Sequence, residues 1–230
     1  MGTYCERIAP PPTLCADFDE GDPSAVLVDG KLEAFAGAAM GTGTRALGMT
    51  TSKSAPASLR VDIPATGGTQ GRQILSRTLS ASMTHVKIAF DLHVEAVAPA
   101  LLQVITLGGL EMGGAEPYKL NLALEATDAG ALPLYVTEVF HADGGSYTFN
   151  QFLTSASVPL KTWTRLTLDV TFQASGGGTM VVGIGEPPTV VLSRPTRPDL
   201  LGPPTLTLDL FTTSPGITVH YDDYVVVAQP

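Results

Sequence analysis

The sequence predicts an all-β fold, a sandwich of two antiparallel sheets, from three observations. Apolar and polar residues alternate one by one along several segments, which is typical of strands that bury one face. The 230 residues include 24 glycines and 18 prolines, which favour tight turns. Charged residues make up only 15% of the chain, and no segment shows sustained helical periodicity. We therefore expect short strands joined by turns, with almost no helix.

The clearest predicted strand spans residues 85–95. Val86 and every second residue after it up to Val94 are apolar, so these side chains share one buried face. Residues 164–173 and 205–210 alternate in the same way. Further strands are expected at residues 58–63, 101–107, 118–125, 134–140, 146–153, 180–184, 190–193 and 217–227, with glycine-rich hairpin turns at 143–145 and 176–178.

These strands follow one another without a long linker or a change in composition. We therefore expect one domain at residues 15–230, built from two packed sheets. Residues 1–14 form an N-terminal strap in this interpretation, because three consecutive prolines at 10–12 block regular structure. A domain of this length can bury a substantial core without disulfides or structural metals.

The charge balance excludes several classes of partner. The chain has 13 Lys and Arg residues against 22 Asp and Glu residues, for a formal net charge of −9. Nucleic acids require clustered basic residues, so we expect no nucleic-acid binding. An anionic membrane surface and a polyanionic glycan are disfavoured for the same reason, whereas a neutral sugar polymer or a cation remains compatible. No run of about 18 apolar residues occurs, so we expect no membrane-spanning segment.

The two cysteines, Cys5 and Cys15, lie close together in the sequence. In an oxidising compartment they would form a disulfide that closes a short loop; the alternative is two free thiols in a cytosolic protein. The spacing is not that of a zinc site, and no histidine is adjacent. No export signal precedes this segment, and we interpret Met1 as replacing one that was removed. We expect a secreted, periplasmic or cell-surface protein.

Four segments resemble parts of one known fold. LCADFDEGDP (residues 14–23), followed by VDGKLEAF (28–35), resembles its opening strands, and VHYDDYVVVAQ (219–229) resembles its closing strand. Between them, KTWTRLTLDVTF (161–172) is similar to a strand of laminin-G-like domains. In this order, the segments resemble the concanavalin A-like lectin and glucanase superfamily. The resemblance implies a jelly roll in which the N-terminal and C-terminal strands pair.

The resemblance also implies a structural calcium ion, because in this superfamily Ca²⁺ often bridges the first loop and the last strand. Asp223 would supply a carboxylate, and oxygens near Asp19, Glu20 and Gly21 would bind from the other side. Ca²⁺ prefers several hard oxygen ligands, and acidic residues from two chain ends repel one another unless a cation lies between them. The alternative is that these acidic residues are solvated or accept backbone hydrogen bonds.

Catalytic residues are not evident. Laminarinase-like members of the superfamily carry an E-x-D-x-(x)-E strand, whose two carboxylates act as nucleophile and general acid. The nearest approach here, from Glu111 to Glu116, is a glycine-rich loop without the middle aspartate. We therefore do not expect an enzyme. The residues that a lyase site would require are better explained as ordinary outward-facing strand positions: Arg72, Gln73, His141, Tyr147 and Gln151.

The sequence thus predicts an extracytoplasmic lectin-like binding module with a polysaccharide or glycan as partner. In this superfamily the concave sheet presents aromatic and polar side chains to sugars, whose C–H groups pack on aromatic rings. Two alternatives remain: a polysaccharide hydrolase or lyase on the same scaffold, and a structural surface lipoprotein domain without a ligand. The candidate ligand-binding residues lie on neighbouring predicted strands: Tyr135, His141, Tyr147, Asn150 and Gln151.

Overall fold

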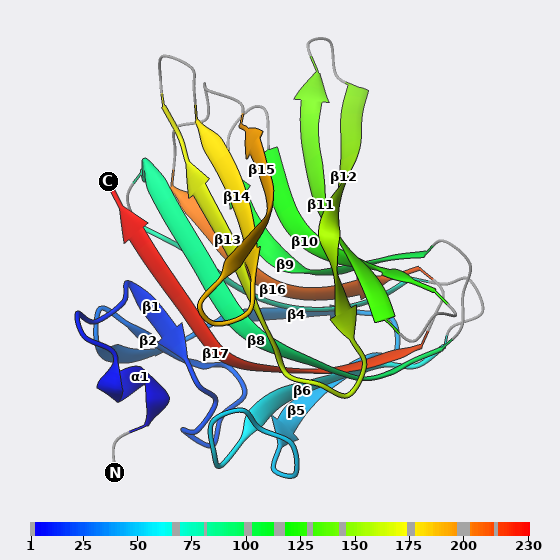
Figure 1. The fold of residues 1–230 in the computed structure, drawn as a ribbon. Helices are drawn as coiled ribbons and strands as arrows, with labels where there is room; N and C mark the ends of the chain where they lie inside the picture. Colours follow the sequence, from blue (N-terminus) through cyan, green and yellow to red (C-terminus); the bar gives the residue numbers. More distant parts are fainter. Residues whose placement is uncertain are drawn as a thin grey trace.

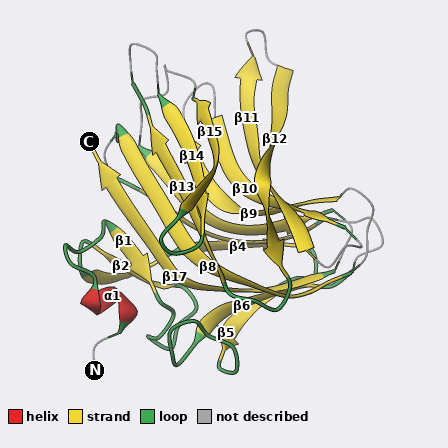
Figure 2. Cartoon of the chain, viewed as in Figure 1, coloured by secondary structure: helices red, strands yellow, loops and turns green. Residues whose placement is uncertain are grey.

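The protein is a sandwich of two antiparallel sheets, A and B (Figures 1 and 2). This confirms the fold class that the alternating segments predict. The computed structural model describes residues 3–65, 70–80, 82–98, 103–112, 118–127, 131–142, 146–173, 178–196, 203–213 and 216–230.

Sheet A contains the first and last strands of the chain. Its main path is β15-β14-β13-β8-β17-β1-β2-β3, and β6 pairs with the first part of β17 and carries β5 at its other edge. Its strands are β1 (Leu14–Ala16), β2 (Ala25–Val28), β3 (Lys31–Ala34), β5 (Thr44–Gly48), β6 (Ser58–Ile63), β8 (His85–Val97), β13 (Thr164–Thr171), β14 (Thr179–Ile184), β15 (Thr189–Pro195) and β17 (Ile217–Gln229).

Sheet B covers the other side of the core. Its strands lie in the order β12-β11-β10-β9-β16-β7-β4, so β12 and β4 are its two edges in the described part of the chain. Its strands are β4 (Ala36–Met40), β7 (Gly71–Thr78), β9 (Gln103–Met112), β10 (Tyr118–Ala126), β11 (Ala131–Ala142), β12 (Ser146–Pro159) and β16 (Pro204–Thr212).

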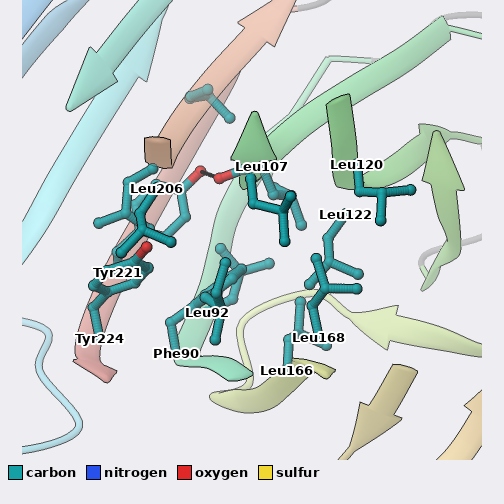
Figure 3. Packing of buried hydrophobic residues seen from close by; sticks show 14 of the residues in the cluster. Phe90, Leu92, Leu107, Leu120, Leu122, Leu166, Leu168, Leu206, Tyr221 and Tyr224 are labelled. Atoms are coloured by element: carbon teal, nitrogen blue, oxygen red, sulfur yellow. Dashed lines mark hydrogen bonds between the residues drawn. The ribbon is translucent and has the colours of Figure 1, made fainter. Parts of the chain in front are cut away.

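The core lies between the inner faces of the two sheets (Figure 3). Phe90 on β8 packs against Tyr221 and Tyr224 on β17, with ring centroids 5.7 and 6.3 Å apart. The Tyr221 hydroxyl crosses to sheet B and donates a 3.0 Å hydrogen bond to the Leu107 carbonyl, so its polar end is satisfied. The predicted inward face of residues 85–95 is buried, as Val86 illustrates. Each side chain of this kind stabilises the fold by about 1.5–3 kcal/mol.

The chain ends meet as the sequence resemblance implies. β1 pairs antiparallel with β17, with Leu14 opposite Val226. Thr13 extends this pairing, because its Oγ1 accepts a 3.0 Å hydrogen bond from the Ala228 amide. The first loop, which follows Ala16, therefore starts beside Tyr224 in the middle of the last strand.

The N-terminal strap differs from the expectation in one respect. A short helix, α1 (Tyr4–Arg7), forms before the three prolines. The prolines therefore limit regular structure in the strap to the residues that precede them. Glu6 stabilises the first turn, since its Oε2 accepts a 2.9 Å hydrogen bond from the Thr3 amide. Cys5 and Cys15 form a disulfide, which confirms the predicted pairing and excludes the free thiols.

Most predicted strands occur at the expected places. The predicted strand at 58–63 coincides with β6, and the one at 146–153 is the first part of β12. The predicted turn at 143–145 lies outside the described residues, as does most of the turn at 176–178, but the strands on either side pair antiparallel in both cases. The described part of the chain contains no helix long and apolar enough to cross a bilayer.

Candidate functional site

The outer face of sheet B, which faces away from the core, carries a hollow of about 700 Å³, including the solvent at its mouth. Six strands that are consecutive in sheet B contribute outward-pointing side chains to it: β7, β16, β9, β10, β11 and β12. Period-two alternation sorts these residues onto the face opposite the leucines of the core. The residues around the hollow are Arg72, Thr106, Glu111, Lys119, Asn121, Thr137, Val139, Phe149, Thr207, Asp209 and Phe211.

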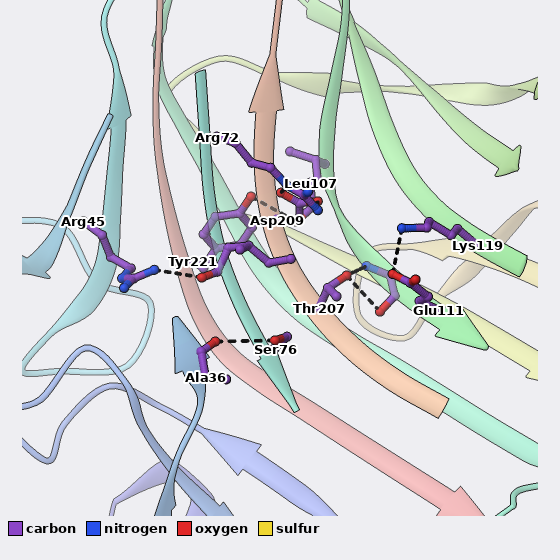
Figure 4. A network of polar contacts seen from close by, with 12 residues as sticks. Ala36, Arg45, Arg72, Ser76, Leu107, Glu111, Lys119, Thr207, Asp209 and Tyr221 are labelled. Atoms are coloured by element: carbon purple, nitrogen blue, oxygen red, sulfur yellow. Dashed lines mark hydrogen bonds and ion pairs between the residues drawn. The ribbon is translucent and has the colours of Figure 1, made fainter. Parts of the chain in front are cut away.

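Two ion pairs lie on this face (Figure 4). Arg72 binds Asp209 in a bidentate manner, with Nε–Oδ1 and Nη2–Oδ2 distances of 2.8 and 2.5 Å. This hydrogen bonding raises the pKa of Arg72 above its usual value, because it stabilises the charged guanidinium. Lys119 on β10 binds Glu111 on the facing position of β9, with an Nζ–Oε2 distance of 2.8 Å. Each cation around the hollow is therefore neutralised by a carboxylate.

Hydroxyl, amide and aromatic groups complete the hollow. Thr207 is buried and exchanges hydrogen bonds with the backbone of Gly109, which fixes its hydroxyl between β16 and β9. Asn121 points from the centre of β10, and Phe149 and Phe211 contribute aromatic rings from β12 and β16. The combination of paired charges, uncharged polar groups and rings resembles the lining that hydroxyl-rich ligands require.

The structure brings several of the predicted ligand residues to this face. In the pairing of β11 with β12, Thr137 lies opposite Gln151 and Tyr135 opposite Leu153. Because Thr137 and Phe149 line the hollow, Gln151 and Tyr135 point to the same side as these residues.

Tyr147 and His141 face each other at the far end of the same strand pair. Tyr147 lies two residues before Phe149 on β12, so its side chain shares the outer face of sheet B, where it is 66% exposed. The side chain of His141 lies outside the described residues.

Asn150 points to the opposite face of sheet B. Its Nδ2 donates a 2.9 Å hydrogen bond to Glu138 Oε2, and the other oxygen of Glu138 accepts a 2.8 Å hydrogen bond from the Tyr118 hydroxyl. Asn150 therefore holds a buried carboxylate in place and is not brought together with the other predicted ligand residues.

Tyr135 differs from the tyrosines of the core because its hydroxyl reaches the outer face, where it donates to the Glu125 carboxylate on β10. This hydrogen bond raises the pKa of Tyr135, since the neighbouring negative charge disfavours ionisation of the phenol. Tyr135 is thus a protonated hydroxyl at neutral pH. Its hydrogen is already donated to Glu125, so the phenol oxygen is left as an acceptor toward the outer face.

Sequence reasoning missed Lys119 and Asp209, and placed Glu111 in a loop. Glu111 instead lies within β9, which continues to Met112. The signal for Lys119 was present, because Lys119 and Asn121 alternate with buried leucines along β10. Gln73, named as a lyase candidate beside Arg72, points inward and donates to the Gly43 carbonyl at 2.7 Å.

The residues predicted to bind calcium lie in a second polar region, on the outer side of sheet A beside β17. Asp223 is 4% exposed, and its Oδ1 accepts a 2.7 Å hydrogen bond from the Ser54 hydroxyl. Asp19 lies on the first loop and accepts a 3.2 Å hydrogen bond from the Ala57 amide. Gly21 has a positive φ of 79°, which lets this loop turn between β1 and β2. Both aspartates therefore anchor the loop at 51–57.

Two carboxylate oxygens in this region have no hydrogen-bond partner, namely Asp17 Oδ1 and Glu20 Oε2. The other oxygen of Asp17 accepts a 2.8 Å hydrogen bond from the Cys5 amide. Burial, followed by the charge of Asp17, raises the pKa of Glu20. A shared proton or a cation would satisfy both oxygens, so the donor chemistry fits Ca²⁺. No three acidic, histidine or cysteine side chains of the described residues are grouped as a metal site, so backbone oxygens or water would have to complete the ligand set.

A Ser–His–Glu series also occurs on the outer side of sheet A. His220 Nδ1 lies 3.0 Å from the Ser58 hydroxyl, and its Nε2 lies 3.0 Å from Glu95 Oε2. Ser58 is fully buried, however, and donates to the Thr51 carbonyl. No substrate can reach this hydroxyl, so the series is structural and does not form a nucleophilic triad.

The two antiparallel sheets form a sandwich consistent with a concanavalin A-like jelly roll, and comparisons with known proteins agree at the level of fold. No protein-family model matches the sequence, and no curated protein matches it. Solved structures, among them the following three, are similar to this chain over most of their length. An endo-β-1,4-glucuronan lyase from Trichoderma reesei has a TM-score of 0.61 at 12% identity, with 83% of this chain and 88% of that chain covered.

The second structure is a variant of alginate lyase Aly36B in complex with an alginate trisaccharide. Its TM-score is 0.56 at 15% identity, with 90% of this chain and 85% of that chain covered. The third is the cellulose-induced protein Cip1, with a TM-score of 0.55 at 13% identity and coverage of 93% and 96%. At such identities the similarity establishes the shared fold alone.

Proposed function

We propose that the outer face of sheet B binds a polysaccharide, and that a neutral, hydroxyl-rich chain is its preferred ligand. The observation that carries this proposal is the pairing of Arg72 with Asp209 and of Lys119 with Glu111 around one hollow. Each pair places strong donors beside strong acceptors, and a sugar hydroxyl both donates and accepts. Because the charges cancel within each pair, the hollow does not select for an anionic ligand.

Aromatic groups support the same function. Phe149 is 56% exposed beside the hollow and Phe211 lines its other side. Pyranose C–H groups pack on such rings while the hydroxyls reach neighbouring polar groups. The disulfide between Cys5 and Cys15 supports a location outside the cytoplasm, where such ligands occur.

A binding panel tests this proposal. The protein should bind at least one neutral polysaccharide, and Asp209→Asn should weaken that binding several-fold, because the hollow loses a charged acceptor. Asp169→Asn is the matched control, since Asp169 also pairs with a basic side chain, His85, but lies on sheet A. Isothermal titration with soluble β-glucans, mannans and xylans measures the effect. An absence of binding to every neutral polysaccharide would contradict the proposal.

A second candidate is cleavage of a uronic acid chain by β-elimination, favoured by the similarity to the glucuronan and alginate lyases. In this reaction a base removes the C5 proton, the C4–O4 bond breaks, and the leaving O4 takes up a proton. Under this second proposal Tyr135 would be the donor of that proton, which it would have to withdraw from its hydrogen bond with Glu125. A cation must neutralise the substrate carboxylate, which requires Arg72 or Lys119 to leave its partner.

The unsaturated product of β-elimination absorbs in the ultraviolet, so incubation with alginate and with glucuronan tests the second candidate directly. Lyase activity that falls at least tenfold in Tyr135→Phe would support it. Neutral-sugar binding without any such product would assign the face to binding alone. The Asp209→Asn variant sharpens the choice, because freeing Arg72 should favour uronate ligands over neutral ones.

We also propose that a calcium ion stabilises the junction of the chain ends, with the orphaned oxygens of Asp17 and Glu20 among its ligands. Ca²⁺ would supply charge neutralisation there and no catalytic step. Its addition should raise the melting temperature in wild-type protein but not in Glu20→Gln. If Ca²⁺ added after chelation leaves the melting temperature unchanged, the calcium proposal is wrong. A proton shared by Asp17 and Glu20 would then be the explanation for their two unpaired oxygens.

A further inference from the structure

The outer face of sheet A carries a hollow of its own, on the opposite side of the sandwich from the hollow of sheet B. It encloses about 580 Å³, including the solvent at its mouth. Strands β17, β8 and β13 form its floor, and the turn between β14 and β15 forms one wall. Its lining joins apolar side chains with three charged ones, Lys87, Arg165 and Glu186. No part of the proposed polysaccharide site lies on this face.

The hollow exists because one row of side chains across the floor is short. Ala89 on β8 lies opposite Val225 on β17 and opposite Thr167 on β13. In the rows on either side of Ala89, longer side chains stand on the same face, Lys87 at one end and Arg165 at the other. The floor is therefore a depression between two cationic side chains.

The turn after β14 is held against this floor by close contacts. The Gly185 amide donates a 2.9 Å hydrogen bond to the Arg165 carbonyl. Gly183 lets Pro188 pack against β14, because a Cβ on Gly183 would lie 2.9 Å from the Pro188 side chain. Glu186 follows Gly185 directly, so the wall places its carboxylate at the end of the hollow where Arg165 lies.

Two opposite charges at the ends of this hollow form no ion pair within the described residues. Lys87 lies opposite Asp169 on β13, but Asp169 is engaged by His85, whose Nε2 lies 2.8 Å from its Oδ1. Glu186 is exposed on the turn. Arg165, by contrast, is only 12% exposed and is bound in an ion pair of its own. Lys87 and Glu186 are thus the charges left for a ligand.

We propose that this hollow binds a short peptide with free ends, its carboxylate at Lys87 and its ammonium group at Glu186. The apolar side chains of Val225, Val227 and Pro188 contact the body of the peptide. Val227 is 38% exposed in the absence of a ligand, so covering it removes apolar surface from water.

The spacing of the two ends suits a peptide of about three residues. Arg165 lies opposite Asp91, four residues after Lys87 on β8, so the ends of the hollow are about 13 Å apart along the strand. An extended tripeptide spans about 10 Å, and the lysine side chain covers the remaining distance.

Other small ligands use this lining less well. A neutral sugar leaves both charges without an ionic partner. A simple carboxylate pairs with Lys87 but leaves Glu186 unpaired, and the two negative charges repel each other. A zwitterionic peptide neutralises both ends of the hollow at once.

Titration with the tripeptide Ala-Val-Ala, followed by NMR, tests the proposal in wild-type protein. Signals of Ala89 and Val225 should shift, whereas those of Asn121 and Thr137 in the hollow of sheet B should not. The free tripeptide should bind at least threefold more tightly than its C-amidated or its N-acetylated form, because each derivative lacks one charge. Unshifted signals at Ala89 and Val225, or equal binding of the three peptides, would overturn the proposal.

Two variants assign the two ends separately. Lys87→Met should abolish the preference for a free carboxylate and keep the preference for a free amine, and Glu186→Gln should do the converse. Lys31→Met is the matched control, because Lys31 is an exposed lysine on the edge strand β3 of the same sheet, and it should keep both preferences. A wild-type preference for the free carboxylate alone would refute the peptide and assign the hollow to a simple carboxylate.

Discussion

Carboxylates occur in two regions of this molecule with opposite surroundings. On the outer face of sheet B, Asp209 and Glu111 each contact a cation directly at the lining of the hollow. Beside β17 on sheet A, Asp222 and Asp223 are buried and face mainly N–H and hydroxyl donors, from Lys53 and Ser54 among others. The first arrangement keeps the charges available to a ligand, whereas the second uses them to hold the loop at 51–57 against the last strand.

The two regions consequently differ in the pKa values of their carboxyl groups. Burial, followed by the charge of Asp223, raises the pKa of Asp222 to about 8, and burial raises that of Asp223 to about 6. Neither group has a cation of its own within the described residues; Arg165 in the same region forms its ion pair with Asp91. Ionising the buried carboxyl groups beside β17 should therefore lower the stability of the fold at neutral pH. The paired carboxylates on the outer face of sheet B should lower it little.

The largest expected effect concerns the covalent link that fastens the strap over the buried carboxylates. Replacing Cys5 and Cys15 with serine should lower the free energy of unfolding by about 3 kcal/mol, as expected for a loop of this length, whose cysteines are 10 residues apart. Urea denaturation measures the change. Reduced wild-type protein provides the matched control, and a loss below about 1 kcal/mol would show that the strap does not contribute to the stability of this region.

A smaller effect is expected from the pH dependence of Asp223. Its folded pKa of about 6 lies above the ordinary value of 3.8, so between these pH values the native state binds more protons than the unfolded state. Stability should therefore fall as the pH rises through this window. Asp223→Asn should flatten this fall and add on the order of 1–3 kcal/mol at pH 7 in the presence of a chelator. Asparagine also tolerates the positive φ of 46° at this position.

Thermal denaturation from pH 4 to pH 7 checks this prediction. Asp169→Asn, on a half-buried ion pair of sheet A, should leave the slope of stability against pH nearly unchanged. A slope that is the same in Asp223→Asn and in wild-type protein would mean that Asp223 is ionised in the folded state already at low pH.

The smallest effect on stability is expected on the outer face of sheet B. Asp209→Asn should lower the free energy of unfolding by about 1 kcal/mol. Asp209 is only 8% exposed, but Arg72 is 37% exposed, and the asparagine oxygen can still accept a hydrogen bond from it. Urea denaturation of this variant beside Asp223→Asn compares the two regions directly. A loss above 2 kcal/mol would assign the Arg72–Asp209 pair to the fold and weaken its assignment to ligand binding.

Sequence reasoning located the strands whose buried face is uniformly apolar and missed those whose buried face is not. On β7 the inward positions include Gly71 and Gln73 beside Leu75, so the alternation is hidden. On β4 all five residues, Ala36–Met40, are exposed, and no contrast between faces exists. A pattern of apolar residues predicts a strand only where burial differs between its faces.

The candidate site was predictable in part for the same reason. Adjacent strand residues point to opposite faces, so Asn150 and Gln151 could not both face one ligand, and the structure separates them. The pairing of Lys119 with Glu111 depends on the register between β9 and β10, which side-chain alternation alone does not specify. The position of a strand was thus easier to predict than its cross-strand partners.

The antiparallel pairing of β1 with β17 affects how the domain resists mechanical force. Leu14 begins β1 and lies opposite Val226, close to the end of β17. Force applied outward through these two points acts at one end of the strand pair, so its hydrogen bonds break one after another. Peeling of this kind requires less force than shearing, in which all bonds of a strand pair resist at once. The junction of β1 with β17 would therefore open at low force, and because Leu14 is part of the core, its opening would expose one edge of that core.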